Sequence, residues 1–549
     1  MPQINMEEYI EELIYTISRK DPIKARVLLN YFDKLDKNTR ERFINELSSS
    51  DNEYSIPLLS MIASDYPHQC PDMKKLKAIL IEKFLTSPSK LIELLQNHQT
   101  IQNKKIFIEI AGELHSEEAL QSIIDILNSN TDHDTIIEAL HAFGNIGSSE
   151  PVNIITDHLY SNNRKIIVAA IKALRKIATP AALSRLSERM GTDTQLDLLI
   201  IDVFAQVQDA VSLEKLNGTL ISHSAIIRNY GKTKLINIGE KSVPTLIGNL
   251  SQDDPDLLIH TLNALGSIGD KSAINPIRKF LFNEPKNPNV RFAAYEALGL
   301  LPLEKESYVL ANGLADPVEN VRMAAAKALN RNYNQILAVG IRNLLKNKEN
   351  NPHEIIRVII DSESDNIFLD LINEERVRKF ATIYLKNKAH QDITKHFVNL
   401  LNGKGHEDIA LKIQRAEEKK SSGMKVFVVD DSRMILNVYR TTLHSMGFDP
   451  ILFEFPASLL EAVETEKPDL LITDLNMPEL TGIDVATKIR EKFDSAALPI
   501  IMVTTQNETN DNEAAHKAGV DYIMQKPFDA KSLGEAIRKV SHKKGKTAE

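Results

Sequence analysis

Five polar residues in the C-terminal quarter of the chain each stand at the end of a short apolar run. They are Asp430 and Asp431 after KVFVV, Asp474 after LLIT, Thr504 at the end of IIMVT, and Lys526 after YIMQ. Three carboxylates that converge repel one another at neutral pH, and a hard divalent cation with oxygen ligands is the simplest compensation, which Mg²⁺ satisfies. A nucleophilic carboxylate, a metal ion, a hydroxyl and an ammonium group together provide what phosphoryl transfer requires.

These side chains meet only if the apolar runs lie side by side as parallel strands. From Met424 onward such runs alternate with amphipathic patterns, which is typical of a parallel sheet covered by helices. We expect strands at residues 425–429, 450–454, 470–473, 500–504 and 522–525. We expect helices to begin near Ser432, Ala457, Thr481, Asn510 and Lys531. Five such units predict a doubly wound α/β fold whose ligands bind beyond the carboxyl ends of the strands.

The blocks VVDDSR, LLITDLNMPELTGID, IIMVTT and QKPF resemble the signature blocks of the two-component receiver (CheY-like) family. The resemblance covers residues 424 to about 541 and implies a flavodoxin-like fold with Asp474 as the phospho-acceptor. It also implies a bound Mg²⁺, with Asp431, Asp474 and the backbone carbonyl of Asn476 as ligands. Asp430 would assist, often through water.

The same resemblance assigns roles to residues on the last two strands. It implies that Thr504 bonds a phosphoryl oxygen, and that Lys526 places its ammonium on the acceptor carboxylate or the phosphoryl group. It implies a cis peptide bond before Pro527. One departure is Ile523, which stands where receivers usually keep an aromatic switch residue. Tyr522 beside it is expected on the opposite face of the strand, so the usual route of signal transmission is in doubt.

A different periodicity governs the residues before about 403. Segments such as EALHAFGNIG, NALGSIGDKS and EALGLLPLEK recur about every 31 residues. The large apolar residues at their third position form the series Leu140, Leu174, Phe204, Leu235, Leu265, Leu298 and Leu329. Apolar steps of three and four, interrupted by pairs such as Asp254-Pro255, predict two helices per period. The segment DPVENVRMAAAKAL resembles part of a HEAT repeat, and stacked helix pairs predict an all-α solenoid.

The periodicities divide the chain into four predicted parts. They are an N-terminal helical region at 1–100, a HEAT-like solenoid at 101–402, a charged helical linker at 403–423 and a receiver-like domain at 424–549. The first part fits either a cap of the solenoid or a separate helical bundle. The segment HEDIALKIQRAEEKK fits either a stiff linker or a final solenoid cap.

Individual residues of the array have structural interpretations. We expect the alanines of VRFAAYEAL and VRMAAAKAL to pack between helices, and Arg291 and Arg322 to pair with neighbouring acids. His133, His390 and His396 are expected at the surface, because none has the spacing of a metal pair on a helix. No part of the array gathers a nucleophile, a base and an oxyanion donor.

Whole-chain properties narrow the class of protein. At 549 residues the chain exceeds a single core. A single cysteine, Cys70, and an N-terminus without the features of a signal peptide predict a cytoplasmic protein. No run approaches the ~18 apolar residues of a membrane helix. The net charge of −9, with neither part basic, argues against nucleic acid as a partner.

These observations favour a bacterial two-component signalling protein over an enzyme. In this hypothesis Asp474 receives a phosphoryl group from a histidine kinase or phosphotransfer protein, and the array binds a protein partner that the sequence does not identify. The alternative is an enzyme, because HEAT-like arrays also occur in bilin lyases and DNA-repair glycosylases. The acidic balance opposes a glycosylase, and no residues of the array supply chemistry for a lyase.

Overall fold

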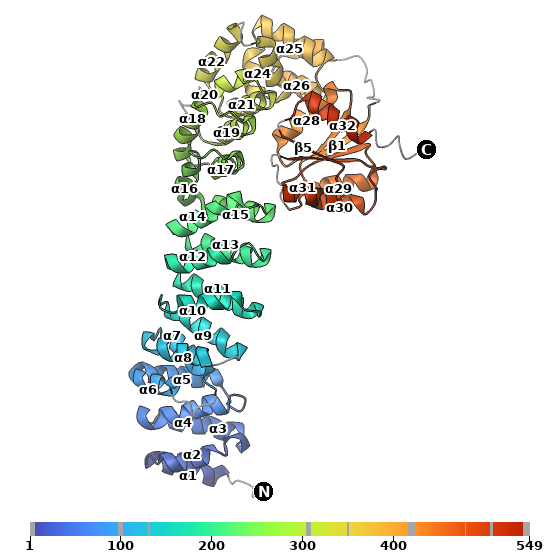
Figure 1. Ribbon diagram of the computed structural model, residues 1–549. Coiled ribbons are helices and arrows are strands. Elements are labelled where there is room, and N and C mark those ends of the chain that lie inside the picture. Colours follow the sequence, from blue (N-terminus) through green and yellow to red (C-terminus); the bar gives the residue numbers. More distant parts are fainter. Residues whose placement is uncertain are drawn as a thin grey trace. The chain divides into compact units, whose positions relative to one another are not determined.

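The computed structural model describes residues 6–96, 103–129, 132–303, 309–347, 351–414, 423–477, 479–504, 509–526 and 528–541. By its backbone contacts the chain forms two compact units, Met1–Ser212 and Leu213–Glu549. The first unit is helical, and the second contains further helices followed by a sheet with its own helices (Figure 1). Within the described ranges, no helix is both long enough and apolar enough to cross a membrane.

The first unit is built from stacked helices. They are α1 (Met6–Ser18), α2 (Pro22–Leu29), α3 (Lys37–Ser48), α4 (Asn52–Asp65), α5 (Met73–Thr86), α6 (Pro88–Gln96), α7 (Lys105–Glu113), α8 (Leu120–Ser129), α9 (His133–Ile146), α10 (Val152–Asp157), α11 (Arg164–Ile177), α12 (Pro180–Arg189) and α13 (Thr194–Val207). Aspartate caps begin many of them; Asp36, Asp51 and Asp132 each accept a backbone N–H of the first turn. Helices α5 and α6 pack on α7 and α8, so the N-terminal helices continue into the array.

The array continues through the second unit. Its helices are α15 (Ala225–Ile238), α16 (Val243–Asn249), α17 (Pro255–Ile268), α18 (Ile274–Phe282), α19 (Pro288–Leu300), α20 (Val309–Asn312), α21 (Glu319–Arg331), α22 (Gln335–Lys346), α23 (Pro352–Asp361), α24 (Asp365–Leu371), α25 (Glu375–Asn387), α26 (Gln391–Gly403) and α27 (Glu407–Ile413), with α14 (Ala210–Gly218) at the boundary of the units. Asp254 and Asn287 cap α17 and α19, and a proline follows each cap, as the breaker pattern predicts.

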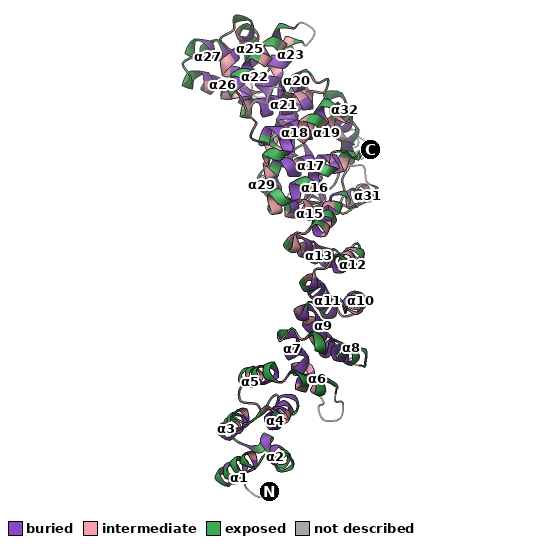
Figure 2. Ribbon diagram, turned by 90° about the vertical axis from the view of Figure 1, so that its left-hand side faces the viewer, coloured by how far each residue is buried: buried purple, intermediate pink, exposed green. Residues whose placement is uncertain are grey.

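The repeat positions lie in the second helix of each pair. All seven predicted residues, from Leu140 in α9 to Leu329 in α21, are at most 1% exposed. The alanines predicted to pack between helices are also buried, including Ala293 in α19 and Ala325 in α21. Figure 2 shows in purple that buried residues occur along these helices. The prediction of a helical solenoid is therefore confirmed, because one apolar face per helix is buried by its neighbours.

Glycines allow the second helices of successive pairs to approach closely. A Cβ atom added at Gly266 in α17 would lie 2.8 Å from the Cα atom of Ala297 in α19. One added at Gly299 in α19 would lie 2.9 Å from the Cα atom of Ala328 in α21. Real Cβ atoms do not approach backbone so closely, so these positions require glycine or a shift of the neighbouring helix.

Replacing Gly266 with Ala is expected to destabilise the array by about 1–3 kcal/mol, because overpacking displaces backbone. The matched control is Gly248→Ala in α16, where an added Cβ would meet nothing within 4 Å. That control is expected to raise stability slightly, by up to about 1 kcal/mol, through helix propensity. Urea unfolding followed by circular dichroism compares the two midpoints, and equal shifts would contradict the close-approach argument.

The array arginines pair with acids as predicted. The Arg291 guanidinium donates to Asp316 through Nε and Nη2, at 2.7 and 3.0 Å. The Arg322 guanidinium donates to the backbone carbonyl of Asp316 at 2.8 Å and lies 3.9 Å from Glu354. These contacts join successive repeats, so both arginines have a structural role in the array.

The predicted surface position is correct for His133, holds in part for His396 and is wrong for His390. His133 is exposed, whereas His396 is half-buried with Nε2 2.7 Å from Asp365. The side chain of His390 is 12% exposed, and its ring packs edge-on against His444 at 4.8 Å. His390 belongs to the array and His444 to the sheet domain, so packing between these two parts buries it.

Residues after 423 form a five-stranded parallel sheet in the described part of the chain. Its strands are β1 (Lys425–Val429), β2 (Asp449–Phe453), β3 (Leu470–Asp474), β4 (Ile500–Thr504) and β5 (Tyr522–Gln525), in the order β2-β1-β3-β4-β5. Its helices are α28 (Arg433–Ser445), α29 (Pro456–Thr465), α30 (Gly482–Arg490), α31 (Thr509–Lys517) and α32 (Ala530–Ser541). Helices α28 and α32 cover one face, and α29, α30 and α31 cover the other (Figure 1). The predicted doubly wound fold is confirmed, with element bounds within two residues of those expected.

The segment between array and sheet domain is only partly described. Helix α27 packs against α25 and α26 and buries Ile409, Ala410 and Ile413. Residues 407–413 therefore complete the array as its last helix. Most of the remaining predicted linker, residues 415–422, lies outside the described residues.

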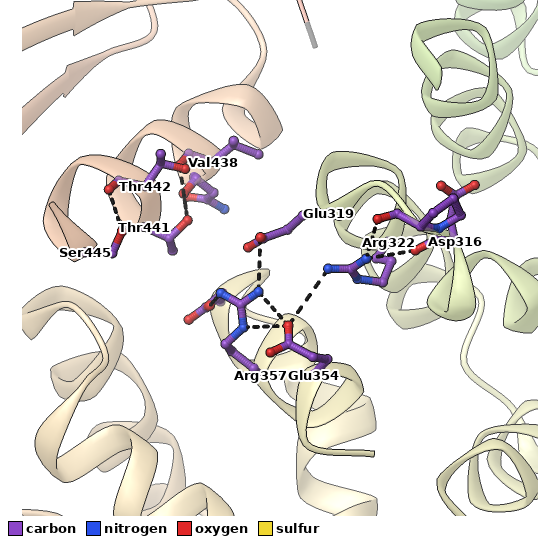
Figure 3. A network of polar contacts seen from close by, with 12 residues as sticks. Asp316, Glu319, Arg322, Glu354, Arg357, Val438, Thr441, Thr442 and Ser445 are labelled. Atoms are coloured by element: carbon purple, nitrogen blue, oxygen red, sulfur yellow. Dashed lines mark hydrogen bonds and ion pairs between the residues drawn. The ribbon is translucent and has the colours of Figure 1, made fainter. Parts of the chain in front are cut away.

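Helix α28 of the sheet domain contacts the array within the second unit. Arg440 on α28 forms an ion pair of 2.7 Å with Glu363, which follows α23. Beside this contact, Arg357 pairs with Glu319 at 3.0 Å and Glu354 at 2.7 Å (Figure 3). Arg357 and Glu319, together with polar residues of α28, line a shared cavity of about 480 Å³. The contact is therefore polar, which is typical of domain interfaces that can separate.

Candidate functional site

The strand order determines where the predicted site residues lie. Asp474 is the last residue of β3 and is paired with Val503 of β4, so Thr504 comes one residue beyond it. The backbone N–H of Lys526 donates to the carbonyl of Thr504 at 2.8 Å. Asp430, directly after β1, donates its N–H to Phe453 of β2. The carboxyl ends of four strands thus present these residues at one edge, as parallel topology requires.

The Lys526 ammonium lies between two buried carboxylates. Its Nζ atom is 2.6 Å from Asp430 Oδ2 and 2.6 Å from Asp474 Oδ1. The three side chains are 10%, 1% and 9% exposed, respectively. Bonds between ions in such a dry setting are strong and depend on both partners. The structure therefore brings together the predicted acceptor carboxylate and the predicted lysine.

Burial and the charges of neighbouring residues shift the pKa values of the residues in this cluster. Burial alone would lower the pKa of Lys526, but attraction to Asp430 and Asp474 raises it well above its usual value. Burial, together with repulsion from Asp474, raises the pKa of Asp430 to about 7 although Lys526 acts in the opposite direction. Desolvation by the surrounding protein, and then the charge of Asp474, raises the pKa of Asp431, whose side chain still reaches solvent. One ammonium does not neutralise three carboxylates, so the cluster has an excess of negative charge.

This excess of charge fits a divalent cation. Oxygens of Asp430 and Asp474 converge on one point, which the Lys526 ammonium occupies, and Asp431 lies at the same rim. Hard carboxylate oxygens are the donors that Mg²⁺ prefers. Among the described residues, no three acidic, histidine or cysteine side chains already have the geometry of a metal site.

The loop after β3 returns tightly to the acceptor. The backbone N–H of Asn476 donates to Asp474 Oδ2 at 2.8 Å, and the N–H of Gly482 donates to the carbonyl of Leu475 at 2.9 Å. A Cβ atom at Gly482 would lie 2.1 Å from the backbone oxygen of Asp474, so only glycine fits there. Sequence reasoning overlooked Gly482, although a glycine eight residues after a strand-end aspartate is a signal for such a turn.

The last strand separates the two residues considered for signal transmission. Ile523 packs on the cluster that contains Met502 and Val520. The Tyr522 hydroxyl accepts a hydrogen bond of 3.2 Å from Lys539 on α32, which lies on the other face of the sheet. The two side chains thus lie on opposite faces, as strand alternation predicts. The predicted cis peptide bond before Pro527 lies outside the described residues.

Residues of the array line the same cavity as the acceptor. This cavity of about 150 Å³ contains Asp430, Asp431, Asp474 and Lys526 together with side chains from α15, α17, α19 and α21. The array contributes Lys232, His260, Asn263, Asn289, Glu296 and Asn320 among others. The Nδ2 atom of Asn289 donates to the backbone carbonyl of Lys526 at 2.6 Å. Sequence reasoning missed all of these residues, because repeat patterns do not show which face of a helix receives another domain.

Comparisons with known proteins find separate matches for the sheet domain and for the array. The family model for the response regulator receiver domain matches residues 426–538, and that for HEAT repeats matches 243–330. Chemotaxis protein CheY1 of Helicobacter pylori is 35% identical over 119 residues, which are 21% of this chain and 96% of that protein. The alkaline phosphatase synthesis transcriptional regulatory protein PhoP of Bacillus subtilis is 32% identical over 21% of this chain, which spans only about half (48%) of that relative. The crystal structure of CheY4 of Vibrio cholerae is 27% identical over 22% of this chain and 99% of that chain, with a TM-score of 0.21.

Proposed function

The chain belongs to the response regulator receiver family, and we propose that it is a phosphorylation-dependent signalling protein in which Asp474 accepts a phosphoryl group. The observation that carries this proposal is the Asp474 carboxylate at the end of β3, held within 2.6 Å of the Lys526 ammonium. In the reaction, a bond between phosphorus and the donor breaks as a bond from an Asp474 oxygen to phosphorus forms. The donor keeps the electron pair and takes up a proton.

The residues around Asp474 have distinct roles in this proposal. Asp430, Asp431, Asp474 and the backbone carbonyl of Asn476 would hold Mg²⁺, which would offset the charge on the transferring oxygens. Lys526 orients the acceptor carboxylate before transfer and balances the negative charge afterwards. Thr504, at the neighbouring strand end, would donate its hydroxyl to a phosphoryl oxygen.

A small phosphodonor tests the chemistry directly. Full-length protein incubated with acetyl phosphate in Mg²⁺ is expected to gain a hydroxylamine-sensitive phosphate on one aspartate. Removing Mg²⁺ with EDTA is expected to reduce labelling by at least about tenfold, because the carboxylate cluster then lacks its compensating charge. Mass spectrometry of tryptic peptides measures the labelled fraction. Labelling that is equally strong in EDTA would contradict the metal-dependent mechanism.

The donor and output are a further part of the proposal. A histidine kinase or phosphotransfer protein supplies the phosphoryl group, and the array acts as the output by binding a protein partner. The array supports this role because its stacked helices present a long surface, as solenoids generally do. We propose no enzymatic output beyond self-phosphorylation and autodephosphorylation.

Affinity capture with and without beryllium fluoride, a mimic of the phosphoryl group, tests the output. We expect the immobilised full-length protein to retain a partner whose amount changes at least about threefold with the mimic, since about two added charges alter the domain contact. The control is Asp474→Ala, which is expected to retain the same amount of partner with and without the mimic. A partner that responds equally in both proteins would contradict a phosphorylation-controlled output.

A further inference from the structure

An array lysine reaches into the acceptor cavity. Lys232 on α15 lines the cavity that contains Asp430, Asp431 and Asp474. Asp431 and Asp474 are the acids whose charges act on it, and Arg228 is the nearby like charge. Among the described residues, Lys232 has neither a hydrogen bond nor an ion pair. The array thus places a lysine without a hydrogen bond or an ion pair to any described residue in the cavity of the predicted phospho-acceptor.

Partial burial of the Lys232 ammonium costs free energy, which a bound anion would offset. Burial is the main reason why the pKa of Lys232 is lowered, and the two aspartates only partly oppose that effect. Lys232 is half-buried, and a partly desolvated cation without a hydrogen bond or an ion pair favours a ligand that supplies one. Glu296 on α19 lies in the same cavity, but Arg331 is the first of the charges that act on it. Lys232 is therefore the array cation best placed for an anion on Asp474.

We propose that Lys232 is a ligand of the phosphoryl group carried by Asp474, so that the array and the receiver domain form one phosphoryl-binding site. This inference rests on the proposed function, because it needs Asp474 to be phosphorylated. A phosphoryl group adds about two negative charges and three acceptor oxygens, and a lysine ammonium has three donors. The cavity of about 150 Å³ leaves room for it, since one water needs only about 15 Å³ by the same kind of measure.

A second contact at this site joins the array and the receiver domain. The Asn289 side chain on α19 holds the backbone carbonyl of Lys526 at 2.6 Å. Lys526 and Lys232 would then contact the phosphoryl group from the receiver and the array, respectively. A charged hydrogen bond across this boundary would make the phosphorylated receiver hold the array more tightly than the unmodified receiver does.

Binding of beryllium fluoride in Mg²⁺ to the full-length protein, followed by fluorine NMR, tests the inference. Lys232→Ala is expected to weaken binding about tenfold, as loss of a charged hydrogen bond does. Lys232→Arg, which keeps the charge, is expected to stay within about threefold of wild type. The matched control is Lys234→Ala on the same helix, whose ammonium instead lies over the Tyr230 ring at 4.6 Å. That control is expected to bind like wild type.

Hydrogen exchange of α28 separates ligand binding from simple docking. Lys232→Ala is expected to keep wild-type protection there in the absence of beryllium fluoride; lost protection would mean a structural role and would overturn the inference. Unchanged affinity in Lys232→Ala, or an equal loss in Lys234→Ala, would also overturn it. If wild type neither binds the mimic nor accepts a phosphoryl group, the proposed function itself has failed and the inference falls with it.

Discussion

Asp474→Asn is expected to lose phosphorylation completely, to the background of the assay. An amide lacks the negative oxygen that attacks phosphorus, whereas its shape lets the N–H of Asn476 keep an oxygen acceptor in place of Asp474 Oδ2. The fold of the domain is therefore expected to survive the change. Hydroxylamine-sensitive labelling by acetyl phosphate in Mg²⁺ measures the effect, and circular dichroism verifies the fold.

The control for Asp474→Asn is the same change at the other end of the strand. Asp469 directly precedes β3 and accepts the backbone N–H of Lys425 at 2.9 Å through Oδ2. It is exposed and far from the strand ends that form the site. Asp469→Asn is expected to be labelled like wild type. Persistent labelling of Asp474→Asn would show that another residue is the acceptor.

Lys526→Met is expected to affect both stability and phosphorylation. It leaves Asp430 and Asp474 buried without their shared ammonium, and removing one partner of a buried ion pair typically costs about 3–5 kcal/mol. In EDTA we expect a loss of this size in the unfolding free energy of the receiver domain. Mg²⁺ is expected to restore part of the stability but not the phosphorylation rate, because the lysine also balances the transferred charge. Urea unfolding with and without Mg²⁺ measures the first effect.

Two further variants identify the cause of the Lys526 effect. Lys539→Met removes a lysine of the same domain that is exposed on α32, and it is expected to change stability by less than about 0.5 kcal/mol. The double variant Lys526→Met with Asp430→Asn removes one of the two stranded carboxylates. It is expected to be more stable than Lys526→Met alone, since the double-mutant cycle isolates their interaction. Additive effects would show that the ion pair contributes little.

The positions of the strand-end residues could be predicted from the sequence, because each one follows from the pattern of a single strand. Asp430, Asp474, Thr504 and Lys526 each end or follow an apolar run, and parallel topology then places every such end at one edge. Strand and helix bounds follow from the same alternation of patterns. The role of Gly482 was harder to predict, because it depends on how closely the loop returns to the backbone of Asp474.

The contact between the array and the sheet domain could not be predicted in this way. Lys232 and Asn289 lie at the site although they are more than 140 positions away from Asp430 in the sequence. The period of the repeats indicates which side of a helix faces its neighbours, but it carries no signal for a polar face that receives another domain. The surface prediction for His390 was wrong for this reason, since His444 of the sheet domain covers it.

In the proposed function, the cavity around Asp474 would limit the access of large phosphodonors more than that of small ones. In the proposed function, acetyl phosphate would enter a space lined by α15, α17 and α19, whereas a phosphohistidine on a protein domain would need those helices to move away. The rate of transfer from a protein donor is then multiplied by the fraction of molecules in which the receiver has separated from the array. A partner that stabilises the closed arrangement would thus slow the phosphoryl transfer that controls its own binding. The ratio of the two donor rates reports how often the protein opens.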